Sequence, residues 1–206
     1  MLQYIYQALI FFRKAFSRSS TWLMFCTVVL GFIATSEMRG VSSFCRFWCM
    51  DTSGYNALIH FFRTSAWSLD KITEYWGTFV LAQNKTVRSN GRAVLLGDHT
   101  CVPKDGRQMP CVVSLRQDSE TQSKPSYFRG HYWGCIGMVT GSIKSSFCIP
   151  LSFGIHHGLM HVKDKPKESR RTSGTRLVQM ALDFAIRHNL SCVLVLDAFF
   201  PWSSSF

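Results

Sequence analysis

The 206-residue sequence lacks the marks of a membrane or secreted protein. Its uncharged apolar run at residues 22–34 has thirteen residues, short of the ~20 that cross a bilayer as a helix. A signal peptide would need a cationic start and a small-residue cleavage site, and neither is evident. We therefore expect packed N-terminal helices, a cytoplasmic location and no membrane partner, with an anchor formed by residues 1–34 as the alternative.

The sequence also has no C-x-x-C motif, although it contains 8 cysteines. Most of them lie inside apolar runs, where a free thiol behaves as a small hydrophobic side chain. Cys45 and Cys49 are separated by three residues, but no second pair accompanies them as a zinc site would require. The pattern favours reduced thiols in an intracellular protein over a disulfide framework.

Acidic residues are scarce. The chain has 12 Asp and Glu against 23 Lys and Arg, a net charge of +11. The excess is spread along the chain, so a basic tail does not explain it. Such a balance favours a polyanionic partner, nucleic acid first and an anionic membrane surface second.

Hydrophobic spacing divides the chain into two regions. Residues 1–85 show helical periodicity, and the polar stretch 86–91 is a boundary. The predicted domains are therefore a helical region at 1–88 and a sheet-containing region at 89–206. The latter reads as a strand, two strands paired by a short connection, a helix at 175–188 and a last strand. We predict an α+β or α/β fold in which an incomplete ribonuclease-H-like mixed sheet carries a flanking helix.

Two apolar runs in the second region end in an aspartate. Residues 93–96 lead to Gly97 and Asp98, and residues 192–196 lead to Asp197. A carboxylate at the end of a buried strand is costly unless it is paired, and a divalent cation is a common partner. Two such strands make a candidate metal site. The alternative is that both aspartates cap ordinary turns.

Several motifs around these aspartates resemble bacterial insertion-sequence transposases of the DDE class. They are LLGDHT at 95–100, KDGRQMP at 104–110, QDSETQSKP at 117–125, GHYWG at 130–134 and LDAFF at 196–200. The helical stretch FFRTSAWSLD at 61–70 is similar as well. The resemblance extends from about Trp22 onward.

The resemblance implies a ribonuclease-H-like domain in which three acidic residues bind two Mg²⁺ (or Mn²⁺) ions. These ions activate water or a DNA 3′-hydroxyl for attack on a phosphodiester. By position, Asp98 matches the first acid and Asp197 the second. The third acid, a glutamate on a later helix, has no counterpart in residues 198–206, and Asp118 and Glu120 lie in a polar stretch between strands.

We therefore expect a truncated, catalytically incomplete N-terminal portion of a transposase. The alternative is a non-catalytic DNA-binding remnant that interferes with an intact transposase. The partners implied are transposon-end and target DNA, with self-association possible.

Basic residues flank the first aspartate and fill residues 163–176. In a DNA-binding protein they would neutralise phosphates, and otherwise they are solvated loop residues. His156, His157 and His161 are read as phosphate contacts in preference to a zinc site. The candidate DNA-binding residues are Lys104, Arg107, Lys124, Arg129, Lys163, Lys165, Lys167, Arg170 and Arg171.

Overall fold

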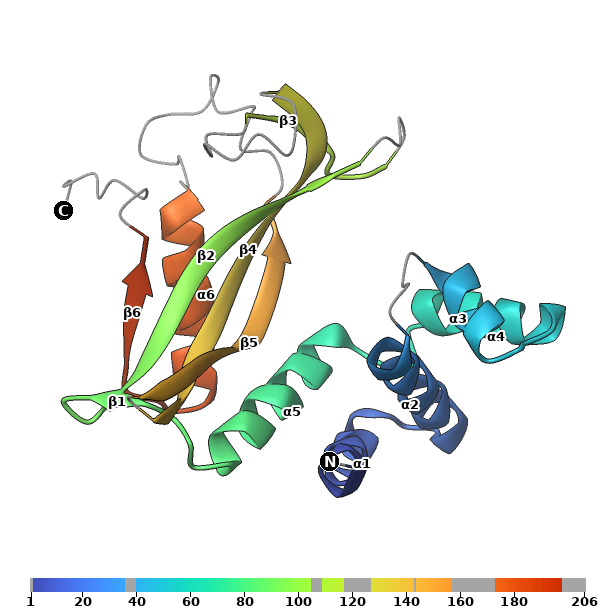
Figure 1. Ribbon diagram of the computed structural model, residues 1–206, viewed down its shortest axis with the longest axis horizontal. Helices are drawn as coiled ribbons and strands as arrows, with labels where there is room; N and C mark the ends of the chain where they lie inside the picture. Colours follow the sequence, from blue (N-terminus) through green and yellow to red (C-terminus); the bar gives the residue numbers. More distant parts are fainter. Residues whose placement is uncertain are drawn as a thin grey trace. The chain divides into compact units, whose positions relative to one another are not determined.

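The computed structural model describes residues 2–35, 40–104, 109–116, 127–142, 144–156 and 173–197. The chain forms two compact units, Met1–Val80 and Leu81–Phe206 (Figure 1). The predicted domain boundary between residues 88 and 89 stays a prediction.

The first unit is helical. Its α4 begins after Asp51, whose Oδ1 accepts a hydrogen bond from the Gly54 amide at 2.9 Å. This bond and one from the Ser53 hydroxyl lower the pKa of the Asp51 carboxyl, as is usual for an N-cap carboxylate. The elements are α1 (Leu2–Phe11), η1 (Phe12–Ala15), α2 (Ser19–Ala34), α3 (Val41–Phe47), α4 (Thr52–Arg63) and α5 (Leu69–Ala82).

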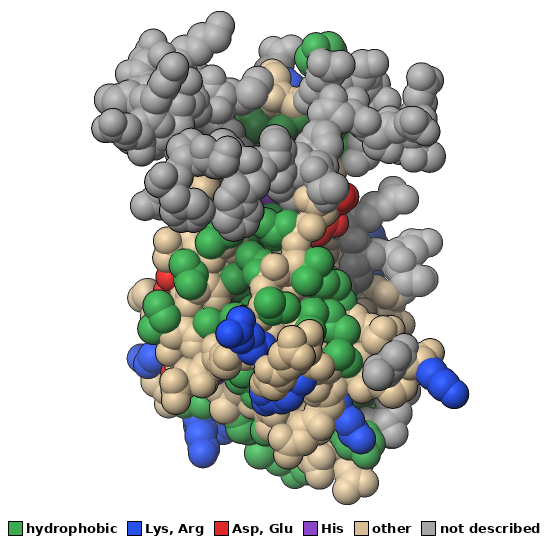
Figure 2. Space-filling model, turned by 90° about the vertical axis from the view of Figure 1, so that its left-hand side faces the viewer, with side chains coloured by type: hydrophobic (Ala, Val, Ile, Leu, Met, Phe, Trp, Pro, Cys, Tyr) green, Lys and Arg blue, Asp and Glu red, His purple; other side chains and the backbone are tan. Residues whose placement is uncertain are grey.

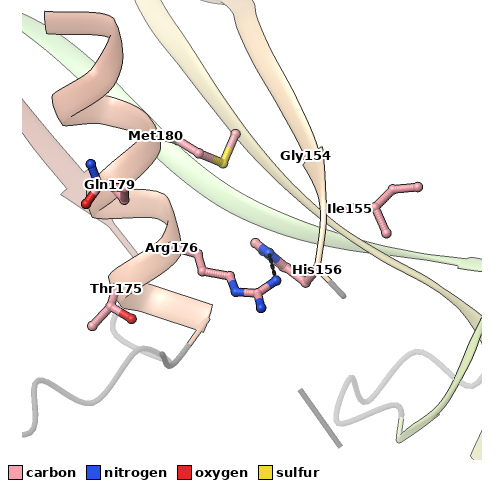
Figure 3. A pocket seen from close by; sticks show the side chains of 7 residues that line it. All are labelled: Gly154, Ile155, His156, Thr175, Arg176, Gln179 and Met180. Atoms are coloured by element: carbon pink, nitrogen blue, oxygen red, sulfur yellow. Dashed lines mark hydrogen bonds between the residues drawn. The ribbon is translucent and has the colours of Figure 1, made fainter. Parts of the chain in front are cut away.

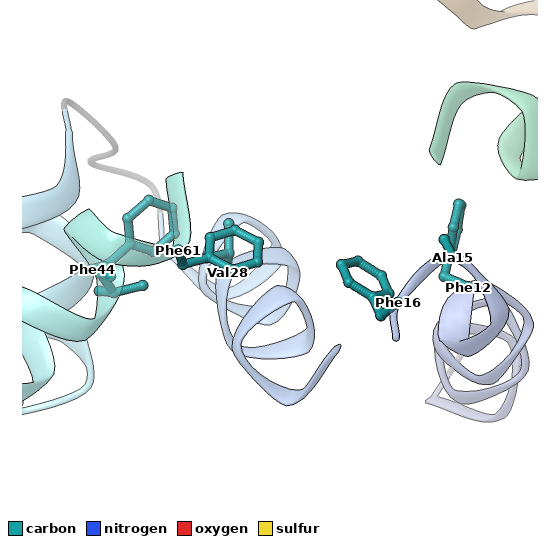
Figure 4. Packing of buried hydrophobic residues seen from close by; sticks show 7 residues of the cluster. Phe12, Ala15, Phe16, Val28, Phe44 and Phe61 are labelled. Carbon is teal, nitrogen blue, oxygen red and sulfur yellow. The ribbon is translucent and has the colours of Figure 1, made fainter. Parts of the chain in front are cut away.

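Aromatic side chains dominate the core of the helical unit. Its buried residues come from η1, α2, α3 and α4 and from Phe16, and Figure 4 shows most of them. Trp67 stacks on Phe61 with ring centroids 5.1 Å apart and donates its indole N–H to the Phe61 carbonyl. Within the described residues, every helix is too short or too polar to traverse a bilayer. The buried set is Phe12, Ala15, Phe16, Val28, Phe44, Leu58 and Phe61.

The second unit is built on a mixed sheet, so the predicted α+β class is confirmed. Strands β4 and β5 form the expected antiparallel pair, and α6 then leads into the last strand. The helix ends near Asn189, whose φ of 48° is left-handed and suits a helix C-terminus. The elements are β1 (Arg88–Ser89), β2 (Arg92–Pro103), β3 (Val113–Arg116), β4 (Tyr127–Ser142), β5 (Ser145–Ile155), α6 (Ser173–Arg187) and β6 (Cys192–Leu196).

One prediction about β2 is wrong. Asp98 does not end this strand, because β2 continues to Pro103 and Asp98 lies in its middle. The polar residues after Asp98 remain in the sheet because they pair with β4 from Asp98–Cys135 to Pro103–Gly130. Pairing with a long neighbouring strand therefore outweighs the local polar signal.

The two faces of the sheet differ. Ala93, Leu95, Ile136 and Met138 are buried on the face that α6 covers, and Leu177 of α6 is 0% exposed. Leu177 packs over Gly97 and Gly134, where a Cβ atom would come within 3.4 Å of its methyl groups. The opposite face carries exposed apolar side chains, which include Leu96, Phe153, Val193 and Val195.

Leu177 should therefore contribute strongly to stability. We expect Leu177→Ala to lower the free energy of unfolding by about 2–5 kcal/mol, because the change removes buried methyl groups and leaves a cavity. The matched control is Leu182→Ala on the same helix, where the side chain is 49% exposed and the loss should stay below about 1 kcal/mol. Urea unfolding followed by circular dichroism measures both, and equal losses would contradict this packing.

Candidate active site

Asp98 lies in β2, and Asp197 directly follows the neighbouring strand β6. Strands β2 and β6 are parallel, and Gly97 pairs with Leu196, so the two aspartates are the next residues of each chain segment. Neighbouring strands are about 4.8 Å apart. The ladder ends at the Gly97–Leu196 pair, so the backbones of Asp98 and Asp197 leave this pair side by side.

Asp98 lies on the face of the sheet that α6 does not cover. Gly97 and Leu196 point toward α6, since a Cβ atom at Gly97 would meet Leu196, Leu177 and Leu194. Side chains alternate along a strand, so Asp98 of β2 points away from α6. Both Asp98 and Asp197, the residue after β6, are exposed. Water and a dissolved cation can therefore reach them. The Asp98 Oδ1 accepts a hydrogen bond of 2.7 Å from the His99 amide.

A thiol lies beside this pair. Cys135 of β4 is the register partner of Asp98. Burial, with smaller contributions from Cys148 and the Asp98 carboxylate, raises the pKa of the Cys135 thiol to about 11. Cys135 is thus protonated and neutral at pH 7. A neutral thiol is a poor ligand for a hard cation, so the oxygen donors here come from the two aspartates.

The chemistry of this donor set fits part of a magnesium or manganese site. Hard cations take carboxylate oxygens, and two exposed carboxylates are present. Within the described ranges, no three His, Cys, Asp or Glu side chains gather closely enough to hold a metal ion. Asp118 and Glu120, considered from the sequence as substitutes for a third acid, lie outside the described residues.

Directly behind Asp98, on the α6 side of the sheet, lies a histidine pair. The Nε2 atoms of His99 and His156 are 2.6 Å apart. His99 stacks on Tyr132 with ring centroids 4.8 Å apart, and the His156 amide donates to the Tyr132 carbonyl at 2.8 Å. His156 is 3% exposed, so the pair forms part of the packed interior.

Arg176 fixes the arrangement of protons in this pair. Its Nη1 lies 3.4 Å from Nδ1 of His156 (Figure 3). A guanidinium only donates, so His156 accepts at Nδ1 and donates from Nε2 to Nε2 of His99. That chain requires both rings to be neutral. Consistently, burial lowers the pKa of each to about 4, and for His156 the nearby His99 and Arg176 add to the effect.

His156 and Arg176 also line an open cavity of about 330 Å³ between β5 and α6, together with Gly154, Ile155, Thr175, Gln179 and Met180 (Figure 3). Gly134 makes room for the histidine, because a Cβ atom there would lie 2.6 Å from its Nε2. The sequence did not predict this cluster, and the reading of His156 as a phosphate contact is wrong, because the residue is buried. The G-H-Y-W-G motif contains Tyr132 and Gly134, but only strand pairing reveals that they meet His99 and His156.

Two of the predicted DNA-binding residues are described. Lys104 follows β2 and Arg129 lies in β4, and the Lys104 amide donates to the Arg129 carbonyl at 3.0 Å. Both therefore lie at the end of β2 beyond Asp98. The others fall outside the described residues: Arg107, Lys124, Lys163, Lys165, Lys167, Arg170 and Arg171, as do His157 and His161.

An exposed carboxylate in one strand and a second directly after the neighbouring strand are compatible with a metal-dependent nuclease. The profile of the family described as DDE superfamily endonuclease matches residues 12–206. The chain therefore belongs to the DDE superfamily of endonucleases. Neither a curated protein nor a solved structure gives a match.

The histidine pair should make stability depend on pH. Each folded-state pKa is near 4 and the unfolded value is about 6.5, so the unfolded chain binds more protons between these values. Stability is full above pH 6.5, falls as the pH drops toward 4, and stops falling from this cause below 4. We expect urea unfolding to give a lower free energy at pH 5 than at pH 7.

The control is His156→Gln, which cannot take up a proton. Its stability should change less between pH 7 and pH 5 than that of the unmodified chain, whatever its stability at pH 7. An equal change in both proteins would assign the pH dependence to other groups.

Proposed function

We propose that this chain carries part of the two-metal catalytic centre of an insertion-sequence transposase, with Asp98 and Asp197 as metal ligands in a ribonuclease-H-like sheet. The observation that supports this most directly is the parallel pairing of β2 with β6. It aligns Gly97 with Leu196, the residues just before Asp98 and Asp197, and family membership adds the expectation of nuclease chemistry.

The side chains of this site would have three tasks. Asp98 and Asp197 would hold divalent cations, Mg²⁺ or Mn²⁺, with their oxygens. When bound, such cations neutralise phosphoryl oxygens and lower the pKa of a water or hydroxyl nucleophile. The exposed sheet face would admit a phosphodiester without a large rearrangement. The buried cluster behind Asp98 would hold that part of β2 rigid, since precise placement of ligands governs this chemistry.

Endonucleases of this superfamily act on DNA, and the net charge of +11 suits that partner. We further propose that the chain acts in the cytoplasm on transposon-end and target DNA, and that it can associate with itself. Lys104 and Arg129 would contact phosphates near the carboxylates. Phosphate contacts of this kind position DNA but carry no sequence information.

By itself the 206-residue chain is proposed to be catalytically incomplete, because three carboxylates are expected and two are identified. A specific observation also favours a second function. The described neighbour of Asp98 on β4 is the protonated Cys135, not a third acid. The second candidate is therefore a non-catalytic DNA-binding protein that competes with an intact transposase for DNA ends.

Nicking of supercoiled plasmid distinguishes a catalytic centre from a non-catalytic DNA-binding protein. If the centre is active, Mg²⁺ or Mn²⁺ should promote nicking and EDTA should abolish it. Asp98→Asn should then slow nicking by more than about 100-fold, because metal stabilisation of the transition state amounts to several kcal/mol. The matched control is Asp183→Asn, which removes an exposed aspartate of α6 and should leave the rate unchanged.

Metal binding gives a readout that does not need activity. A Mn²⁺ titration followed by electron paramagnetic resonance should show binding that Asp98→Asn and Asp197→Asn each weaken and Asp183→Asn does not. Metal and DNA binding without nicking would favour the non-catalytic candidate. Mn²⁺ binding unaffected by either site variant would contradict the assignment of both aspartates.

A further inference from the structure

The end of the sheet remote from Asp98 and Asp197 is basic. Arg92 starts β2 and pairs with Ser89, Lys144 lies in the turn between β4 and β5, and the Gly141 amide donates to the Lys85 carbonyl at 2.8 Å. Arg187 ends α6, and the segment after it enters β6 where Ala93 donates to the Ser191 carbonyl. We define the basic end as five exposed residues: Lys85, Arg88, Arg92, Lys144 and Arg187.

Two of these cations share a hollow in the surface. Arg88 and Lys144 line it together with Val87, Gly141 and Ser142, and its volume is about 490 Å³. The Arg88 guanidinium donates to the Gly91 carbonyl at 2.9 Å, which ties it to the β1–β2 turn. Gly141 has a φ of 103°, a value that glycine tolerates without strain. The cations are thus mounted on turns that strand pairing holds in place.

No carboxylate offsets these charges within the same segments. Residues 85–97, 139–149 and 184–196 contain no Asp or Glu. The nearest acid along α6 is Asp183, one turn before Arg187, and it accepts a hydrogen bond from Gln179 at 2.8 Å. Figure 2 views the side on which Figure 1 places β6 and the β1–β2 turn, and Lys and Arg side chains gather in its lower part.

We propose that the basic end binds the sugar–phosphate backbone of duplex DNA. The partner class rests on the proposed function, and the surface itself rests on the charges just described. Arg92 and Asp98 are six residue steps apart along the strand, which is roughly 20 Å. That is about six base pairs of B-DNA at 3.4 Å each. The basic end would therefore grip the duplex about half a helical turn from the phosphodiester held at the carboxylates.

Salt-dependent DNA binding tests this surface. The measurement uses fluorescence anisotropy with a labelled 30-base-pair duplex, in EDTA and in the Asp98→Asn/Asp197→Asn background, so that cleavage plays no part. Replacing Arg88, Arg92 and Lys144 together by Gln should weaken binding and reduce the slope of log K against log salt concentration by about 2–3. Each phosphate contact contributes about 0.9 to that slope.

Two further variants make the outcome specific. Arg92→Gln/Lys144→Gln leaves the Arg88 bond to Gly91 intact and should reduce the slope by about 1–2, which guards against misfolding of the turn. The matched control Arg18→Gln/Arg63→Gln/Lys71→Gln removes three exposed cations of the helical unit. It should reduce the slope by less than the triple variant does.

Three results would overturn the proposal. The first is an unchanged salt slope in basic-end variants that still fold, and the second is an equal loss of slope in the helical-unit control. The third is that the basic-end variants lose binding to vesicles of anionic phospholipid but keep their binding to DNA.

The two proposals can fail separately. If the aspartate variants lose nicking or Mn²⁺ binding but the basic-end variants keep the salt slope, the metal-ligand assignment holds and this surface is wrong. If the basic-end variants reduce the slope but the aspartate variants keep Mn²⁺ binding, the surface holds and the metal-ligand assignment is wrong.

Discussion

The in-register parallel pairing of β2 with β6 is the constraint on which the rest of this structure depends. It aligns Gly97 with Leu196, and everything proposed about the carboxylates follows from that alignment. A shift of one residue would turn Asp197 toward α6 and into an apolar interior, where an unpaired carboxylate is costly. The leucines that pack between the sheet and α6 oppose such a shift, because Leu177, Leu194 and Leu196 all lie near the space that Gly97 leaves open.

Successive side chains of β2 point to opposite faces of the sheet, so neighbouring residues have very different surroundings. Asp98 lies on the solvent side, whereas His99 lies in the packed layer under α6. The interior pair is held neutral because burial disfavours charge, and Arg176 sets which nitrogen carries each proton. Asp98 on the other face is exposed to solvent. The same strand therefore has buried side chains on one face and exposed ones, including the Asp98 carboxylate, on the other. The alternation of side chains along the strand decides which residue lies on which face.

Much of the fold could be read from the sequence, because hydrophobic periodicity is a local signal. It located the helices of the first unit, the pairing of β4 with β5, the helix before the last strand and the two apolar runs that lead to Asp98 and Asp197. The extension of β2 beyond Asp98 could not be read, since it depends on hydrogen bonds to Gly130–Cys135. The contacts of Cys135, His156 and Arg176 also depend on register between segments far apart in sequence, and the basic end collects charges from three such segments.

Strand β6 has a consequence for handling the protein. In the described part of the chain it pairs with β2 alone, so its other edge presents backbone N–H and C=O groups flanked by the half-exposed Val193 and Val195. An edge of this kind can template the addition of a strand from a neighbouring molecule. High protein concentration would thus favour strand pairing between the β6 edges of neighbouring molecules. Dilution, or an extended peptide bound to this edge, would suppress it.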